Sequence, residues 1–171
     1  MPYTFITGGA SSVKSTLALT LFRGENNVTF IATGRITDPE MEKRIDAHRS
    51  QRPPSWRTVE EPLDLITAVS NTDAESRNVI IDCLTFWVSN LIYEKGMDDS
   101  RILKRAEKTA RYLEGSQKSV LVVSNELGMG IIPADSESRR FRRIAGEVNQ
   151  LFASCSKDAY YVVSGIPLKI K

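Results

Sequence analysis

The stretch Thr7-Gly8-Gly9-Ala10-Ser11-Ser12-Val13-Lys14-Ser15-Thr16 decides the fold that we expect. It follows the apolar run Tyr3-Thr4-Phe5-Ile6 and precedes Leu17-Ala18-Leu19-Thr20-Leu21-Phe22, whose apolar residues have a helical period. A strand, a turn of small residues and a helix form the context of a phosphate-binding loop, in which backbone N–H groups and the helix N-terminus face an anion. In such a loop Lys14 reaches the terminal phosphates and Ser15 is a ligand of Mg²⁺.

One position departs from the pattern Gly-x-x-x-x-Gly-Lys-[Ser/Thr], because Val13 stands where the pattern has its second glycine. A β-branched side chain restricts the backbone at this point and is expected to crowd the bound anion. If the loop keeps its usual shape, we therefore expect Val13 to weaken nucleotide binding.

Composition bounds the class of protein. The chain has 171 residues, of which 41% are apolar and 26% charged, so we expect one globular domain spanning residues 1–171. A net charge of +2 gives no indication of a nucleic-acid partner. The apolar runs fall short of the roughly 20 residues of a membrane span, and we see no secretion signal. Cys83 and Cys155 are isolated, which favours a reducing cytoplasm.

Apolar, β-branched runs alternate with helical patterns along the chain. The predicted strands are Thr4–Thr7, Val28–Ala32, Thr58–Glu60, Val79–Asp82, Val120–Ser124 and Tyr160–Ser164, with an edge piece at Leu168–Ile170. The predicted helices are Lys14–Arg23, Asp38–Arg49, Pro62–Ser70, Thr85–Glu94, Ser100–Glu114 and Ser136–Cys155. This alternation predicts an α/β fold, a mostly parallel sheet flanked by helices, with ligands at the carboxyl ends of the strands.

Two strand ends carry carboxylates that have a functional and a structural interpretation. Asp82 ends a buried strand and either holds Mg²⁺ or caps the helix that follows. Beside a phosphate loop, we favour the metal role. Glu60 either accepts hydrogen bonds from a base or ribose, or pairs with an arginine.

His48 is the single histidine of the chain and stands at the end of a predicted helix. From position alone it is a solvated residue or a cation that compensates the helix dipole. However, Arg44, Arg49 and Arg52 surround it in sequence, and guanidinium groups suit phosphate oxygens. A neutral imidazole in such a place is a candidate nucleophile.

Further candidates lie in loops. Arg35 in Thr33-Gly34-Arg35 contacts a phosphate or is an ordinary loop residue. The segment Asn125–Gly130 either lets its backbone approach a ligand or a neighbouring chain closely, or forms a plain turn. The basic run Arg139–Arg143 is a solvated face, or it meets a substrate phosphate or a subunit interface.

Taken together, these segments resemble the bifunctional adenosylcobinamide kinase / adenosylcobinamide-phosphate guanylyltransferase family of cobalamin assembly. The segments that carry the resemblance are Thr7-Gly8-Gly9-Ala10 with Lys14-Ser15, Ile31-Ala32-Thr33, Arg44-Ile45, His48-Arg49, Arg52-Pro53, Trp56-Arg57-Thr58 with Glu60, Ser124-Asn125-Glu126-Leu127-Gly128-Met129-Gly130-Ile131-Ile132-Pro133, Ala145-Gly146 with Asn149, Val162-Val163-Ser164-Gly165-Ile166 and Lys169-Ile170-Lys171. They span nearly the whole chain in order.

The resemblance implies a P-loop, RecA-like fold and an enzyme that catalyses two successive reactions. The family phosphorylates adenosylcobinamide with a nucleoside triphosphate, ATP or GTP, and then transfers GMP from GTP onto that phosphate, giving adenosylcobinamide-GDP. His48 matches the histidine that carries GMP covalently between the half-reactions. The resemblance places the nucleotide on Gly8, Gly9, Ala10, Ser11, Ser12, Val13, Lys14, Ser15, Thr33, Gly34, Arg35, Arg49, Ser50, Gln51, Arg52, Glu60 and Asp82, with Mg²⁺ at Ser15 and Asp82. It also implies a homo-oligomer, commonly a trimer.

Two alternatives remain open at this point. Beside the active bifunctional enzyme, the chain could be a nucleotide-impaired member, in which Val13 leaves only binding or one of the two activities, or a different small P-loop kinase.

Overall fold

The computed structural model describes residues 3–73 and 76–171, apart from the side chain of Arg44. The candidate contribution of Arg44 to the site therefore lies outside the described residues.

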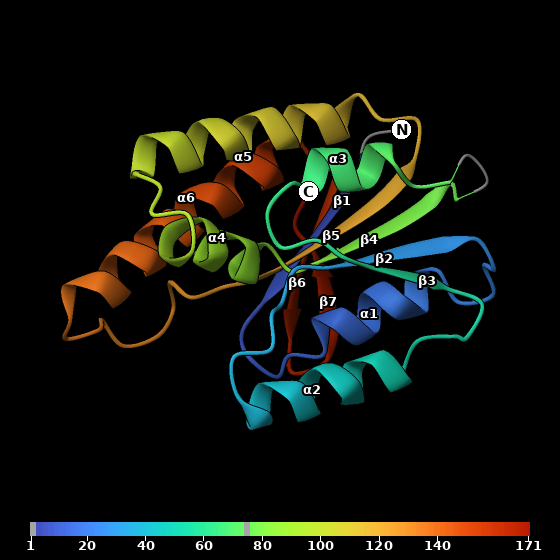
Figure 1. Cartoon of the computed structure of the whole chain (residues 1–171), viewed down its shortest axis with the longest axis horizontal. Helices are drawn as coiled ribbons and strands as arrows, with labels where there is room; N and C mark the ends of the chain where they lie inside the picture. Colours follow the sequence, from blue (N-terminus) through green and yellow to red (C-terminus); the bar gives the residue numbers. More distant parts are fainter. Residues whose placement is uncertain (1–2, 74–75) are drawn as a thin grey trace.

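The described strands form one sheet in the order β3-β2-β4-β5-β1-β6-β7 (Figure 1). Their bounds are β1 Thr4–Gly8, β2 Val28–Ala32, β3 Arg57–Glu60, β4 Asn78–Asp82, β5 Ser119–Asn125, β6 Asp158–Val163 and β7 Ile166–Lys169. β1 to β6 run parallel, and β7 runs antiparallel to β6 at the edge of the sheet. The prediction of a mostly parallel α/β sheet is confirmed.

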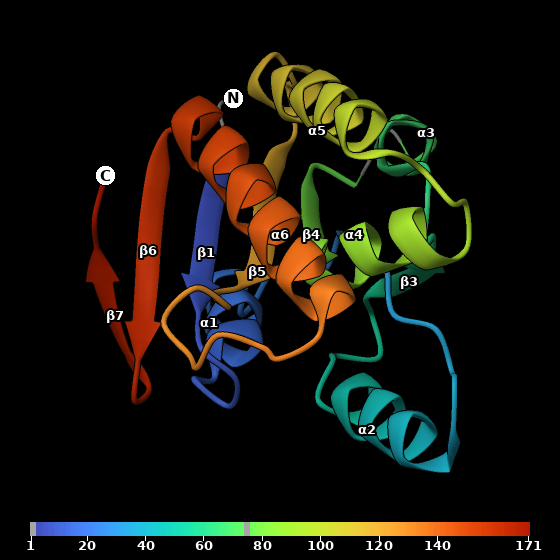
Figure 2. The same ribbon diagram turned by 90° about the vertical axis from the view of Figure 1, so that its left-hand side faces the viewer.

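Helices cover both faces of the sheet. Their bounds are α1 Lys14–Leu21, α2 Pro39–Ser50, α3 Leu65–Ser70, α4 Leu84–Tyr93, α5 Asp99–Glu114 and α6 Ser136–Cys155. α3 to α6 lie on one side and α1 and α2 on the other, and Figure 2 shows α6 lying across the sheet. In the described part of the chain, no helix combines the length and apolar character that a membrane crossing requires.

The apolar strands pack against the helices on both faces of the sheet, because successive side chains of a strand face opposite sides. Val79 and Ile81 of β4 belong to the core under α4, α5 and α6, whereas Ile80 belongs to the core under α1. All three are fully buried. A continuous apolar run is therefore what a central parallel strand requires.

Several predicted boundaries differ by two or three residues, and two of these differences have clear local reasons. The helix predicted from Pro62 begins at Leu65, because the Asp64 carboxylate caps it by accepting from the Thr67 N–H at 3.2 Å, and Glu61 holds the preceding turn. The edge strand predicted at Leu168–Ile170 begins two residues earlier, because Gly165 at φ +82° makes a tight turn directly after β6.

Candidate active site

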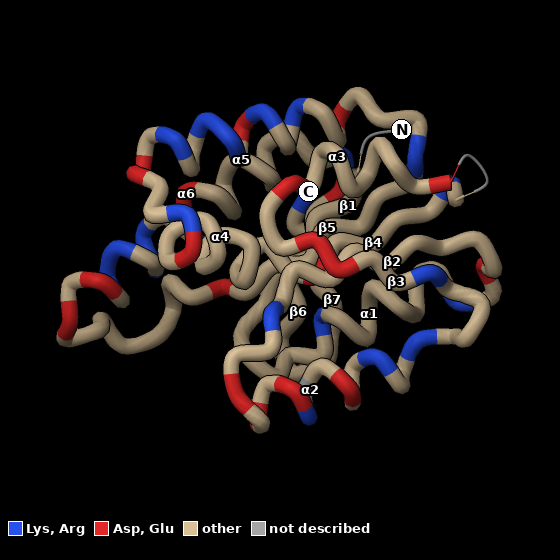
Figure 3. Tube along the Cα trace, in the orientation of Figure 1, with Lys and Arg blue, Asp and Glu red and all other residues tan. Residues whose placement is uncertain are grey.

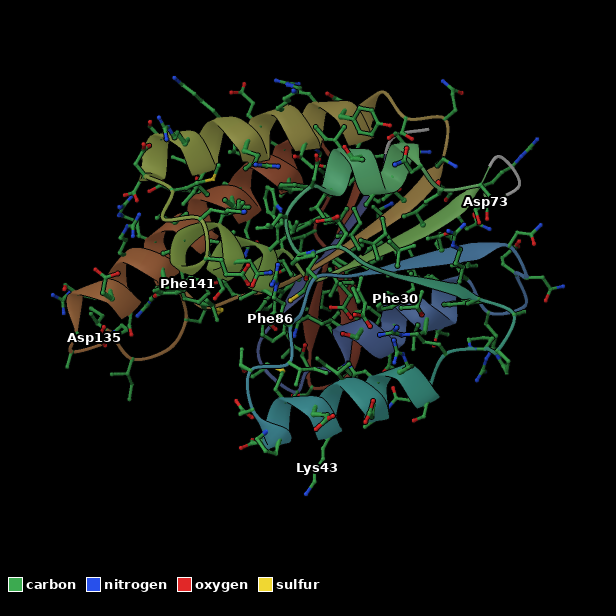
Figure 4. The ribbon with its side chains drawn as sticks, viewed as in Figure 1. Phe30, Lys43, Asp73, Phe86, Asp135 and Phe141 are labelled. Atoms are coloured by element: carbon green, nitrogen blue, oxygen red, sulfur yellow. The ribbon has the colours of Figure 1, made fainter. Side chains whose placement is uncertain are left out.

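A cavity of about 490 Å³ lies at the carboxyl ends of the central strands, under α2. Its polar lining consists of Lys14, Ser15, Arg35, Asp46, His48, Arg49, Arg52, Thr58, Glu60, Asp82 and Asn125. Its other lining residues are Phe30, Ala32, Gly34, Ile36, Met41, Ile45, Pro62, Cys83 and Phe86. Figure 4 shows Lys43, on the outer side of α2, pointing away from the molecule. The carboxyl ends of the strands are where α/β folds place ligands.

The phosphate loop joins β1 to α1, as the sequence predicts. At Gly8 an added Cβ would lie 2.6 Å from both Ser12 Oγ and the Val162 carbonyl oxygen, so the loop closes only over a residue without a side chain. Lys14 is only 7% exposed, and its Nζ donates a hydrogen bond to the Gly9 carbonyl oxygen at 2.9 Å. The ammonium group is therefore held across the loop, beside the cavity.

Val13 adopts φ 62° and ψ 24°, the left-handed conformation that glycine takes at no steric cost. For a residue with a Cβ this conformation costs about 1–2 kcal/mol. Val13 is not among the lining residues, and its Cγ2 lies 3.5 Å from where a Cβ on Gly165 would stand. The predicted backbone restriction is present, and the side chain lies beside the β6–β7 turn. That Val13 crowds a bound anion stays a prediction.

Asp82 and Ser15 meet at the floor of the cavity. The Ser15 hydroxyl is hydrogen-bonded to the Asp82 carboxyl group, and α4 begins at Leu84 with Cys83 as a cap residue without a side-chain cap bond. The alternative that Asp82 caps this helix is therefore wrong. Burial raises the pKa of Asp82, while the Ser15 hydrogen bond and the charges of His48, Lys14 and Arg52 act against that rise.

This oxygen pair fits Mg²⁺, which takes hydroxyl, carboxylate, phosphate and water oxygens. Among the described residues, no group of three or more His, Cys, Asp or Glu side chains is placed to hold a metal. A metal at Ser15 and Asp82 therefore needs nucleotide phosphates and water for its other positions, which is the usual manner of Mg²⁺ binding.

His48 reaches the same cavity from α2. Asp38 caps this helix by accepting a hydrogen bond from the Met41 N–H at 2.8 Å. Acidic residues gather in the first turn and basic ones in the last turn, in agreement with the helix dipole (Figure 3). His48 stands in the last turn and lines the cavity. It lies close enough to Asp82 for its charge to act against the rise in the pKa of Asp82. The structure thus brings the candidate nucleophile to the phosphate loop.

Arg52 lies between the sheet and α2. Its Nη1 donates to Thr58 Oγ1 at 3.1 Å, and its guanidinium carbon lies 3.6 Å from the centre of the Phe30 ring. Burial lowers the pKa of Arg52, with the charge of Asp82 as the largest opposing effect. Its Nε is buried and finds no hydrogen-bond partner among the described residues.

Other predicted residues separate into two groups. Arg49 and Glu60 line the cavity and pair with each other at 2.7 Å, and Arg35 lines it while pairing with Glu94 at 2.9 Å. The predicted residues outside the lining are Gly8, Gly9, Ala10, Ser11, Ser12 and Val13 of the phosphate loop, and Thr33, Ser50 and Gln51. Among the last three, the Thr33 and Ser50 hydroxyls donate to backbone carbonyl oxygens, and Gln51 is exposed.

Thr33 has a structural role in the fold, and its predicted contact with nucleotide stays a prediction. Its hydroxyl donates to the Cys83 carbonyl oxygen at 2.7 Å and accepts from the Cys83 N–H at 2.8 Å. Its carbonyl oxygen accepts from the Asn90 amide at 2.9 Å. Thr33 therefore ties the ends of β2 and β4 together beneath the cavity.

The sequence analysis missed the apolar wall of the cavity. Met41, Ile45 and His48 stand at positions i, i+4 and i+7 of α2, which is the spacing of one helix face. That spacing is a signal that these residues share the inner side of the helix. Phe30 and Phe86 carried no such signal, because aromatic residues in apolar runs usually belong to the core.

The parallel sheet, the strand–loop–helix phosphate site and the strand-end carboxylate define a P-loop nucleotide-binding protein. Two solved structures share the fold: the P4 protein from bacteriophage phi6 in complex with ADP (TM-score 0.51, 15% identity) and an ATPase from a bacterial type III secretion system (TM-score 0.54, 11% identity). The alignments cover 98% and 95% of this chain and about half of those chains, 54% and 51%.

The sequence profile of the cobinamide kinase / cobinamide phosphate guanyltransferase family matches residues 4–170. The bifunctional adenosylcobalamin biosynthesis protein CobU of Escherichia coli K12 is 37% identical, over 97% of this chain and 98% of its own. CobP of Pseudomonas aeruginosa, also a bifunctional adenosylcobalamin biosynthesis protein, is 36% identical over 97% and 95%. The chain therefore belongs to the cobinamide kinase / cobinamide phosphate guanyltransferase family.

Proposed function

We propose that this chain phosphorylates adenosylcobinamide with a nucleoside triphosphate and then transfers GMP from GTP onto the new phosphate, giving adenosylcobinamide-GDP for cobalamin biosynthesis. The observation that carries the proposal is that one cavity joins Lys14 and Ser15 of the phosphate loop to His48 and Asp82. A phosphate loop alone supports a kinase, whereas a histidine beside it supports a second, covalent transfer.

The first transfer needs positioning and charge neutralisation more than a strong base. Lys14 holds its ammonium group across the loop and faces the terminal phosphates. The acceptor hydroxyl attacks the γ-phosphorus and gives up its proton to water, and the bond to the bridging oxygen breaks, which releases the nucleoside diphosphate. Mg²⁺ bound at Ser15 and Asp82 would neutralise phosphate charge during this transfer.

The second transfer uses His48 as a nucleophile. An imidazole nitrogen forms a bond to the α-phosphorus of GTP, and the bond to the β-phosphate oxygen breaks, so that pyrophosphate leaves. An oxygen of adenosylcobinamide phosphate then attacks the same phosphorus, and the N–P bond breaks to regenerate His48. Arg52 and Arg49 at the cavity wall are placed to neutralise the charge on the transferred group.

Labelling with α-³²P-GTP and Mg²⁺ tests the covalent step. We expect the wild-type chain to gain an acid-labile label, and His48→Ala to gain none while it still phosphorylates adenosylcobinamide. Lys43→Ala is the matched control on the same helix, since this side chain points away from the molecule. An unlabelled wild-type chain, or an equally labelled His48→Ala variant, would contradict the proposal.

We further propose that residues 1–171 act as one domain and that the chain forms a homo-oligomer, with a trimer as its form. Exposed apolar side chains support an interface: Val163, Ile166, Leu168 and Ile170 at the β6–β7 edge, and Met129, Ile131 and Ile132 in the loop after β5. Met129 Sδ accepts a hydrogen bond from the Tyr161 hydroxyl at 2.9 Å, which links the loop to β6.

Two buried free cysteines and the use of nucleoside triphosphates support a cytoplasmic location.

A further inference from the structure

Asn125 ends β5, between the strand that leads into the phosphate loop and the strand that ends in Asp82. On one side β5 pairs with β1, where Asn125 lies opposite Gly8, and on the other side with β4, where Val123 lies opposite Asp82. Because successive side chains of a strand face opposite sides, Asn125 shares the face of Val123, which belongs to the core under α1. Asn125 accordingly lines the same cavity as Lys14 and Asp82.

The backbone of Asn125 is fixed from two sides, whereas its side chain is unengaged. Its N–H donates to Thr85 Oγ1 at 2.8 Å, and its carbonyl oxygen accepts from Asn149 Nδ2 at 3.0 Å. Thr85 and Asn149 are both buried. Among the described residues, none makes a hydrogen bond to the side-chain amide of Asn125. The end of β5 therefore holds an amide group in place beside the phosphate loop and leaves its donors unused.

The order of the strands indicates which phosphate this amide meets. In a phosphate loop the lysine reaches the terminal phosphates. Lys14 Nζ donates to the carbonyl oxygen of Gly9, the residue that follows the β1 partner of Asn125. His48 is carried by α2, whose ion pair with the sheet is made to β3, three strands away from β5. The Asn125 amide therefore lies on the side of the terminal phosphates rather than on the side of His48.

We propose that Asn125 is a further catalytic residue of the first transfer, whose side-chain N–H groups bind the γ-phosphate of the nucleoside triphosphate. The inference rests on the proposed function, which makes this loop the nucleotide site. Phosphate oxygens accept hydrogen bonds, so Nδ2 of the amide faces them rather than Oδ1. A donor that is already held in place stabilises the charge on the transferred group without reorganisation. In GMP transfer the γ-phosphate leaves within pyrophosphate, so the amide contributes little to that reaction.

Titration calorimetry with two analogues that differ only in the γ-phosphate tests the contact. These are α,β-methylene GTP and α,β-methylene GDP, each with Mg²⁺, and His48 cannot break their α–β linkage. We expect Asn125→Ala to raise the Kd of the triphosphate analogue about tenfold, through the loss of a hydrogen bond to a charged group, and to leave the Kd of the diphosphate analogue unchanged. Asn125→Asp, which keeps the shape of the side chain but adds a negative charge, should weaken triphosphate binding further.

The rates of the two transfers give a second measurement. Asn125→Ala should lower kcat for phosphorylation of adenosylcobinamide about 100-fold, the usual cost of removing one donor to a transition-state charge. Labelling of His48 by saturating α-³²P-GTP should stay close to the wild-type rate. A merely structural role would change both transfers and both Kd values alike.

Asn78→Ala is the matched control. Asn78 is also a partly buried asparagine at a strand end, but it stands at the opposite end of the neighbouring strand β4. We expect this variant to keep the wild-type Kd for both analogues and both transfer rates.

An Asn125→Ala variant whose Kd rises equally for both analogues, or for neither, overturns the inference and leaves the proposed function intact. Equal loss of both transfers does the same. A wild-type chain that phosphorylates adenosylcobinamide with neither ATP nor GTP overturns the proposed function itself, while the two analogues still test the contact with the γ-phosphate.

Discussion

At the scale of single residues, Asp82 shows a conflict between stability and function. Burial raises the pKa of this carboxyl group, which means that its ionised form is disfavoured in the folded chain. The Mg²⁺ ligand that we propose at this position must nevertheless be ionised. Ser15, His48, Lys14 and Arg52 reduce the cost, and a bound cation would reduce it further.

This conflict predicts opposite effects of one substitution. Because the pKa of Asp82 is raised in the folded chain, protonation of this carboxyl group stabilises the fold. The contribution is complete below the unfolded-state pKa of Asp82 and is lost as the pH rises through its folded-state pKa. At neutral pH without Mg²⁺, Asp82→Asn should therefore raise the midpoint of thermal unfolding, by about 2–4 °C for each kcal/mol of ionisation cost removed. With Mg²⁺ and GDP it should lose the stabilisation that the wild-type chain gains.

Differential scanning calorimetry at several pH values checks both effects. The difference between variant and wild type should shrink as the pH falls through the folded-state pKa of Asp82. A variant that is less stable without Mg²⁺ at neutral pH, or one that is stabilised by Mg²⁺ and GDP as the wild type is, would contradict the assigned role.

At the scale of elements, α2 carries the proposed nucleophile His48, although the helix is weakly anchored. In the described part of this helix no side chain is fully buried, and Met41, Ile45 and His48 are half-buried against the cavity. The Arg49–Glu60 pair that links α2 to β3 is exposed on both sides and contributes at most about 1 kcal/mol. The N-cap at Asp38 therefore matters more here than it would in a buried helix.

Removal of that cap should uncouple the two transfers. Asp38→Ala leaves the N–H group of Met41 without its acceptor and costs about 1 kcal/mol of helix stability. We expect faster amide exchange in residues 39–50 and slower labelling of His48 by α-³²P-GTP. Phosphorylation of adenosylcobinamide should change less, since Lys14 and Ser15 belong to α1. Asp98→Ala, which removes the equivalent cap of α5, is the control and should leave the labelling rate unchanged.

At the scale of the whole molecule, the β6–β7 edge leaves apolar side chains uncovered. The side chains of Ile166 and Leu168 in β7, and of Ile170 directly after it, are all at least half exposed. An exposed apolar edge strand favours association with another chain. The same hairpin carries the turn that lies beside Val13, so an interface here would lie next to the phosphate loop.

A charge on this edge should disrupt the proposed homo-oligomer. Leu168→Lys places an ammonium group where a neighbouring chain would bury a leucine, and we expect light scattering to give the mass of one chain. Tyr112→Lys, an exposed position on α5, is the control and should keep the wild-type mass. A wild-type chain that is already monomeric, or a Leu168→Lys variant of unchanged mass, would contradict the interface.

The sequence by itself determined the fold class, the phosphate loop and most polar residues of the site. The reason is that these features are local: period, chain order and strand-end position suffice to predict that Lys14 and Asp82 meet at one edge of a parallel sheet. The family resemblance, and not local spacing, placed Arg52 and His48 there. His48 also reached the site as predicted. The match of the family profile to residues 4–170 confirms the family that the segments resemble.

Only the tertiary structure decided the roles that depend on contacts between distant segments. Thr33 holds β2 to β4 because Cys83, fifty residues away in sequence, takes both hydrogen bonds of its hydroxyl. Val13 lies beside the turn at Gly165, a neighbour that no pattern around residue 13 indicates. Local spacing specifies which elements form, whereas packing between elements decides which way each side chain turns.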